Sequence, residues 1–154
     1  TAFTLGSKGD SIGRLQYPVG VTLNVAENEV YVADQDNHRI AVFDMKGNPL
    51  RTIGRKGNGD CEFDEPSALF FDSASSILLV ADSDNHRIQL IRPAGNGALV
   101  RQFGSQGWNN GQFISPMGMA VHPVTRHIFV CDFLSNLVQV FDEEGKYQYQ
   151  IGSR

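Results

Sequence analysis

The sequence predicts an all-β fold: a β-propeller made of four-stranded blades, with three blades in this chain. Three markers of different chemistry keep one period, at offsets of 48 and 50 residues. They are Asp34, Asp82 and Asp132 after an apolar run, Pro18, Pro66 and Pro116, and Gly6, Gly54, Gly104 and Gly152. A repeat of this length indicates an array in which each unit buries its faces against its neighbours.

Each repeat contains four short segments rich in β-branched and aromatic residues, and none has a helical pattern. In the first repeat these segments are residues 19–25, 29–34, 38–44 and 49–54. The second segment is apolar on both faces, as in residues 30–33 and 77–81. Both faces of such a strand need cover, which sheets stacked face to face around an axis provide.

The repeat markers divide the chain into a leading segment and three blades. Residues 1–6 match the last segment of each repeat and are expected to be the fourth strand of a preceding or shared blade. The blades are residues 7–54, 55–104 and 105–154. Three blades alone cannot close a ring, and they leave an apolar face bare at each end. We expect two copies to close the ring as a homodimer, or the missing blades to belong to a longer parent protein.

Composition narrows the classes of partner. The chain has 154 residues, 41% of them hydrophobic, and a net charge of -4, which implies no general affinity for nucleic acid or membrane. No segment is long and apolar enough for a membrane span. Cys61 and Cys131 stand at different phases of the repeat and are poor partners for a disulfide, so a reducing, cytoplasmic location is expected.

The longest loops are expected on one face of the propeller, because alternating strands return the fourth-to-first and second-to-third connections to the same side. These loops are residues 7–17, 55–65 and 105–115, with 34–39, 82–87 and 132–136. They carry six basic and ten acidic residues, which accounts for the whole net charge. Phosphate binding needs the opposite sign, so this loop face is expected to bind protein or peptide.

The repeated Asp-x-Asp-Asn-His-Arg turns have three interpretations. Asp34, Asp36 and Asn37 resemble the start of a calcium loop, but its Gly and closing Glu are missing. His38 and His86 would need a third imidazole for zinc, and Asn136 stands there instead. The favoured interpretation is structural: Asp and Asn stop the strand, and Arg pairs with a nearby Asp as a weak, exposed ion pair. No metal and no cofactor is expected.

The third repeat differs in a way that suggests a partner site. Phe133, Leu134 and Leu137 replace polar residues of the other repeats, and Trp108 lies in an uncharged loop with Asn109 and Asn110. Large apolar side chains of this kind are typical anchors for a partner. The alternative is that Leu137 and Trp108 cover core. The repeated turn residues His38, Arg39, His86 and Arg87 complete the set of partner-binding candidates.

No arrangement of catalytic residues is recognisable. There is no Gly-x-Ser-x-Gly, no Cys-His pairing at a suitable spacing, and the glycine-rich residues 54–60 lack the Lys-Ser/Thr ending of a phosphate loop. We therefore expect no enzyme and no catalytic residue. The prediction is a non-catalytic interaction module.

The repeat unit resembles the NHL repeat over essentially the whole chain. Asn37-His38 and Asn85-His86 match the name-giving pair, although Arg39 and Arg87 replace the Leu. The resemblance implies a six-bladed ring of the kind found at the C-terminus of tripartite-motif ubiquitin ligases, in bacterial sensor kinases and in an amidating lyase.

The resemblance implies that protein or peptide binding could serve substrate recognition by a ubiquitin ligase. It also leaves two further functions open. One is RNA recognition, for which the candidates are Lys8, Arg14, Arg55 and Lys56 together with Trp108. The other is a metal-dependent, lyase-like activity.

Overall fold

The computed structural model describes residues 2 and 4–153, and these form twelve strands and two short 3-10 turns. The first sheet contains β1 (Pro18–Asn24), β2 (Glu29–Asp34), β3 (Arg39–Asp44) and β4 (Pro49–Ile53). The second contains β5 (Pro66–Asp72), β6 (Ile77–Asp82), β7 (Arg87–Arg92) and β8 (Ala98–Phe103). The third contains β9 (Pro116–Val121), β10 (Ile128–Asp132), β11 (Leu137–Phe141) and β12 (Tyr147–Ile151).

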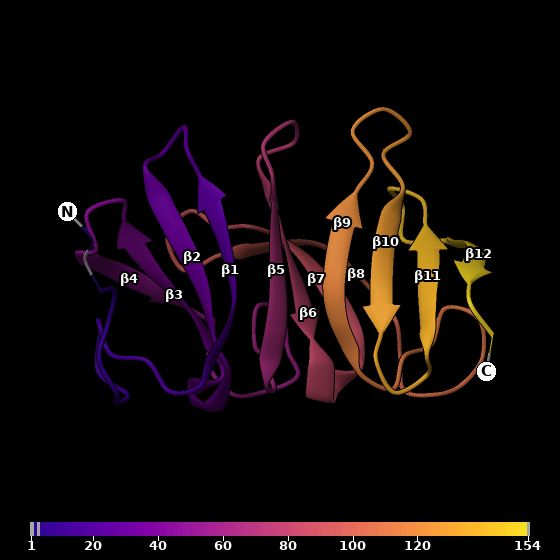
Figure 1. Cartoon of the computed structure of the whole chain (residues 1–154), viewed down its shortest axis with the longest axis horizontal. Coiled ribbons are helices and arrows are strands. Elements are labelled where there is room, and N and C mark those ends of the chain that lie inside the picture. The colour runs from indigo at the N-terminus through magenta and orange to yellow at the C-terminus, as the bar shows by residue number, and fades with distance from the viewer. Residues whose placement is uncertain (1, 3, 154) are drawn as a thin grey trace.

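Each sheet is antiparallel and follows chain order, and the three sheets stand side by side (Figure 1). The first strands neighbour one another, β1 beside β5 and β5 beside β9. The first and third sheets have their fourth strands, β4 and β12, at the two ends of the molecule (Figure 1). This arrangement confirms the predicted all-β fold with three propeller blades, which we number 1 to 3 in chain order. The exact blade boundaries stay a prediction.

Two apolar layers hold the three blades together. The layer between blades 1 and 2 includes Tyr31 and Ile40 from blade 1 and Leu78 and Val80 from blade 2. The layer between blades 2 and 3 includes Leu79, Ile88, Val130 and Phe141, among others. Tyr31 and Leu78 are fully buried. The second strands are therefore covered on both faces where a neighbouring blade exists, as their sequence requires.

The loop that enters each blade also contributes to these layers. Phe63 precedes blade 2 and is buried in the first layer, and Phe113 precedes blade 3 and is buried in the second. Leu15 stands at the same repeat position before blade 1 and packs against Val30, Val32 and Phe43 as a group. Each entering loop thus seals the side of its blade that faces the preceding one.

The Asp-x-Asp-Asn-His turns contain a feature that the strand pattern did not predict. Residues 35–37 and 83–85 form the 3-10 turns η1 (Gln35–Asn37) and η2 (Ser83–Asn85). Each turn ends at a histidine in the left-handed conformation, with φ of 52° at His38 and 54° at His86. Asn136 has φ of 57° at the same position of blade 3. Asn tolerates this conformation better than most residues, which fits the replacement.

The leading segment behaves differently from the other fourth segments. Residues 4–6 form no strand, and residues 1 and 3 lie outside the described residues. A strand needs a neighbour to pair with, and no third strand stands beside this segment. Leu5 nevertheless packs on the apolar face of blade 1.

Candidate functional site

The predicted loop face is real and is held together by the repeated Asp and Arg side chains. In blade 1 the guanidinium group of Arg39 donates to Asp34 at 2.8 Å and to the carbonyl oxygen of Asp10 at 2.6 Å. Asn37 donates to Asp34 and to the carbonyl oxygen of Gly9. The turn after β2 therefore fixes the loop that enters the blade, and both lie on one side of the sheet.

Blade 2 repeats this clamp with more contacts. The Asp82 carboxylate accepts from the Arg87 guanidinium at 2.7 Å, from the Asp64 backbone N–H at 2.7 Å and from Gln89 at 3.1 Å. Arg87 also donates to the carbonyl oxygens of Asn58, Gly59 and Glu62. One ion pair thus orders most of the loop over residues 57–64.

The clamps correct one expectation, because these ion pairs are not exposed. The side chains of Asp34 and Asp82 are 0% exposed, and those of Arg39 and Arg87 are 12% and 10% exposed. An exposed pair contributes about 0 to 1 kcal/mol, whereas removing one partner of a buried pair costs about 3–5 kcal/mol. The structural interpretation of the turns is supported, and the ion pairs contribute more to stability than exposed pairs would. Arg39 and Arg87 are occupied by this role.

Blade 3 builds its turn without an arginine. Asp132 accepts from the backbone N–H groups of Ile114 and Ser115 and from the Ser135 hydroxyl. Leu137 takes the place of the arginine and is only 4% exposed. Of the two readings of Leu137, the structure favours core cover over partner binding.

The two histidines of the turns connect neighbouring blades. The Nδ1 atom of His38 accepts from the Glu65 backbone N–H at 3.1 Å and lies 3.1 Å from the Asp64 carboxylate. The Nδ1 atom of His86 is 2.9 Å from the Ile114 carbonyl oxygen. Each histidine reaches the loop that enters the next blade, so both are positioned for a structural role.

The remaining partner candidates are exposed on blade 3. Trp108 is 53% exposed, Phe133 66% and Leu134 55%, and Asn109 and Asn110 are exposed as well. The other blades have polar or charged residues at the corresponding positions of Phe133 and Leu134: Gln35 and Asp36 in blade 1, Ser83 and Asp84 in blade 2. In the loop that enters blade 1, Ile12 and Tyr17 are also exposed, at 64% and 67%.

Two of the four basic candidates for RNA binding lie beside carboxylates. Arg55 pairs with Glu62 at 2.8 Å, and Lys56 lies 3.6 Å from Asp64. Arg14 donates to the backbone of Lys8 at 3.4 Å. A phosphate backbone would have to compete with these carboxylates, which weakens the electrostatic case for nucleic acid.

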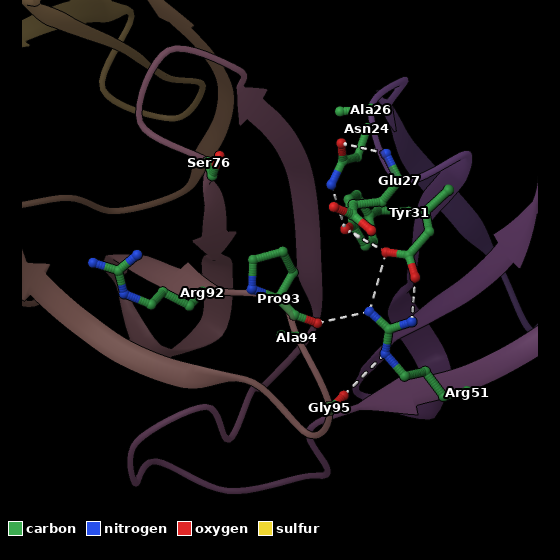
Figure 2. A pocket seen from close by; sticks show the side chains of 11 residues that line it. Asn24, Ala26, Glu27, Tyr31, Arg51, Ser76, Arg92, Pro93, Ala94 and Gly95 are labelled. Atoms are coloured by element: carbon green, nitrogen blue, oxygen red, sulfur yellow. Dashed lines mark hydrogen bonds and ion pairs between the residues drawn. The ribbon is translucent and has the colours of Figure 1, made fainter.

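A cavity of about 500 Å³ lies between blades 1 and 2, with Asn24, Glu29 and Arg92 in its lining. Figure 2 shows Tyr31 and Arg51 facing Pro93, Ala94 and Gly95 across it. Sequence reasoning did not single out this cavity, because its lining residues come from several strands and turns rather than from a repeated motif.

The cavity contains a paired charge. Arg51 donates to Glu29 at 2.5 Å and to the carbonyl oxygens of Pro93 and Gly95, which ties blade 1 to blade 2. Burial and the hydrogen bond to Glu29 raise the pKa of Tyr31 to about 12. Burial acts to raise the pKa of Glu29, but the hydrogen bonds from Arg51 and Tyr31 outweigh it and leave that pKa below its ordinary value of 4.5.

These shifts predict a modest dependence of stability on pH. A carboxyl group with a lowered folded-state pKa stabilises the fold above its ordinary pKa and loses that contribution as the pH falls through the folded-state value. Glu29→Gln is therefore expected to cost about 1–3 kcal/mol at neutral pH, since the Glu29 side chain is only 13% exposed and accepts from Arg51 and Tyr31. The difference from the parent chain should vanish in acid, measured by urea unfolding across this range. An unchanged difference in acid would contradict the assignment.

Two expectations on metals and thiols can be compared with the described residues. Within residues 2 and 4–153, no group of three or more His, Cys, Asp and Glu side chains is placed to hold a metal ion. Cys61 is buried and Cys131 is exposed, and both are free thiols, as their different repeat phases predicted. Within the same residues, no helix is long and apolar enough to cross a membrane.

Fold and loop geometry together define the class: three consecutive blades of a β-propeller with repeated Asp-Asn-His turns. Comparison with known proteins agrees. The sequence profile of the NHL repeat matches residues 15–43, which span the entering loop and β1 to β3 of blade 1. Protein brain tumor of Drosophila melanogaster is 39% identical over 51 residues. The match places an NHL repeat in blade 1.

These matches cover only parts of larger proteins. The similarity to protein brain tumor spans 33% of this chain and 5% of that protein. A chain in the crystal structure of a nidogen/laminin complex superposes with a TM-score of 0.67 at 21% identity, covering 89% of this chain and 48% of that one. The second similarity concerns the fold alone, and the chain spans about half of that structure.

Proposed function

We propose that this chain is a non-catalytic interaction module whose blade 3 loop face binds a protein or peptide segment. One observation carries the proposal: Trp108, Phe133 and Leu134 are all more than half exposed on the loop face, and the turn positions of Phe133 and Leu134 are polar in the other two blades. Large apolar side chains on rigid loops are the usual anchors of protein interfaces. The hydrogen bonds that Asp132 accepts and the sheet beneath this turn supply the rigidity.

The ligand best suited to this face is an apolar peptide segment with basic residues beside it. Asp36 and Asp84 are exposed at the positions that correspond to Leu134, so acidic groups stand on the equivalent turns of the other two blades. In a larger protein this module would select the target, which is the role that a ubiquitin ligase would require. The free thiols fit a reducing compartment such as the cytoplasm.

The proposal can be tested by selecting peptides from a random displayed library against the immobilised chain. Trp108→Ala and Leu134→Asp are each expected to weaken a selected peptide about 30-fold, as loss of an interface hot spot does. Titration calorimetry measures the affinities. Since both side chains are exposed, neither substitution should disturb the fold.

Val124→Ala is the matched control. Val124 is 82% exposed and follows β9 at the opposite edge of the sheets (Figure 1), so its loss should leave the affinity unchanged. Peptides that bind all variants equally, or no enrichment at all, would contradict the proposal. Preferential binding of single-stranded RNA with a steep salt dependence would favour the nucleic-acid function instead.

A further inference from the structure

Each blade has two faces, and equivalent residues of the repeat allow each face to be compared from blade to blade. The forward face of a blade points to the next blade, and the backward face points to the preceding one. Between blades 1 and 2, forward residues Tyr31, Ala33 and Ile40 pack in one layer with backward residues Leu78 and Val80. The same contact recurs between blades 2 and 3. The molecule therefore contains this interface twice.

Among the described residues, no further blade packs against the corresponding forward face of blade 3. Strand pairing aligns Cys131, Val138 and Ile151 in one row across β10, β11 and β12, and Phe129 and Tyr149 belong to the adjacent row. Cys131 is exposed, Ile151 is 53% exposed and Tyr149 is 46% exposed. Cys131 corresponds to Ala33 and Ala81, which are fully buried, and Ile151 corresponds to the buried Ile53 and the partly buried Phe103.

The inner corner of this face is also apolar and exposed. In blade 2 the hydroxyls of Ser67 and Ser83 donate to the carbonyl oxygen of Pro116 in blade 3, at 3.1 and 2.7 Å. Met117 and Phe133 stand 50 residues after these serines and are 42% and 66% exposed. Phe133 therefore occupies a position that, one blade earlier, contacts the next blade.

At the other end, blade 1 presents a partly covered backward face. Val21 and Leu23 on β1 are 65% and 49% exposed. The rest of that face is covered by Leu15, which belongs to the blade's own entering loop, and by Leu5. Leu5 stands 48 residues before Ile53, so it occupies the place of a fourth strand from a preceding blade.

We propose that the forward face of blade 3 binds the backward face of blade 1 of a second copy of this chain, twice, in a closed ring of six blades. A second copy is the expected partner because the chain already contains this blade-to-blade interface twice. The two end faces of the chain carry the same two sides of that interface, one forward and one backward. A two-fold axis satisfies both contacts at once.

The ring would also complete the proposed binding site. Because Ser83 contacts Pro116, its counterpart Phe133 is expected to contact Pro18 of the second copy. Tyr17 directly precedes Pro18 and is 67% exposed. The second copy's Tyr17 would thus join Phe133 and Leu134 on the loop face. This step rests on the proposed function.

The position of Leu5 indicates that the leading segment competes with ring formation. Residues 4–6 form no strand, whereas β12 is paired with β11 along its length. The fourth-strand place beside blade 1 is therefore expected to go to the second copy's β12, with Leu5 displaced. A chain that begins at Ser7 should dimerise more tightly than the full chain.

Sedimentation equilibrium of the full chain at micromolar concentration tests the ring. The expected mass is twice the 17.0 kDa of one chain. Val21→Glu and Ile151→Asp, on opposite end faces, should each return the mass to 17.0 kDa, because either places a charge in an apolar interface. Val124→Glu, at a position that is 82% exposed and on neither face, should stay dimeric. A full chain and a Ser7-start chain that are both monomeric would overturn the proposal.

Peptide binding separates this inference from the proposed function. If the ring is correct, Tyr17→Ala should weaken a selected peptide about tenfold while the mass stays dimeric. A monomer that binds peptide in a manner dependent on Trp108 and Leu134 but not on Tyr17 would overturn the ring and leave the function intact. A dimer that selects no peptide would support the ring and overturn the proposed function.

Discussion

Replacing Asp82 with alanine is expected to lower the free energy of unfolding by about 3–5 kcal/mol, the cost of stranding one charge of a buried ion pair. Asp82 is 0% exposed and accepts from Arg87, Gln89 and the Asp64 backbone. Without the carboxylate, the Arg87 guanidinium keeps only carbonyl partners. Urea unfolding of parent and variant measures the loss.

Two further variants separate the clamp from a general effect on the turn. Asp84→Ala changes an exposed carboxylate in the same turn and should alter stability by no more than about 0.5 kcal/mol. Arg87→Leu copies the side chain that blade 3 has at Leu137, but it leaves the buried Asp82 carboxylate without its cation, so it should cost about 3–5 kcal/mol, as much as the loss of Asp82. If Asp82→Ala costs no more than Asp84→Ala, the clamp is not the main support of the loop.

Phe113→Ala is expected to destabilise the chain by about 3–5 kcal/mol, in the range for truncating a fully buried aromatic residue. Phe113 is 0% exposed in the layer between blades 2 and 3, with ring centroids 5.5 Å from Phe141 and 6.4 Å from Phe103. Its removal opens a cavity between two blades. Thermal and urea unfolding both report the effect.

The chain offers its own control for this prediction. Leu15 stands at the same repeat position before blade 1 but is only partly buried, on a face with no neighbouring blade. Leu15→Ala is therefore expected to cost no more than about half as much as Phe113→Ala. Equal losses at the two positions would show that the entering loop, and not the contact between blades, makes the contribution.

The repeat was sufficient to predict the strands, their order and the side on which the loops meet. Periodic markers such as Asp34, Asp82 and Asp132 fix the architecture, because each blade must satisfy the same packing demands. The free thiols followed from the different repeat phases of Cys61 and Cys131. These features depend on position along the chain, which a sequence shows directly.

Features that depend on the burial of a side chain could not be predicted in the same way. The Arg39 and Arg87 ion pairs looked exposed because they lie in loops, yet the entering loops fold over them. The cavity around Arg51 combines strand residues of blade 1 with backbone carbonyls of blade 2, so no motif marks it. Leu137 looked like an anchor because its neighbours Phe133 and Leu134 are apolar, but it faces the core.

Hydrogen–deuterium exchange of the chain with a selected peptide tests the central claim most directly. The account predicts that the peptide protects backbone amides in residues 105–111 and 133–136, where Trp108, Phe133 and Leu134 lie. Amides at the opposite edge of the sheets, around Val124, should exchange at the same rate with and without the peptide. Protection around Val124, or around the cavity that Arg51 lines, with none at residues 105–111 and 133–136 would contradict the assignment of the loop face of blade 3 as the binding surface.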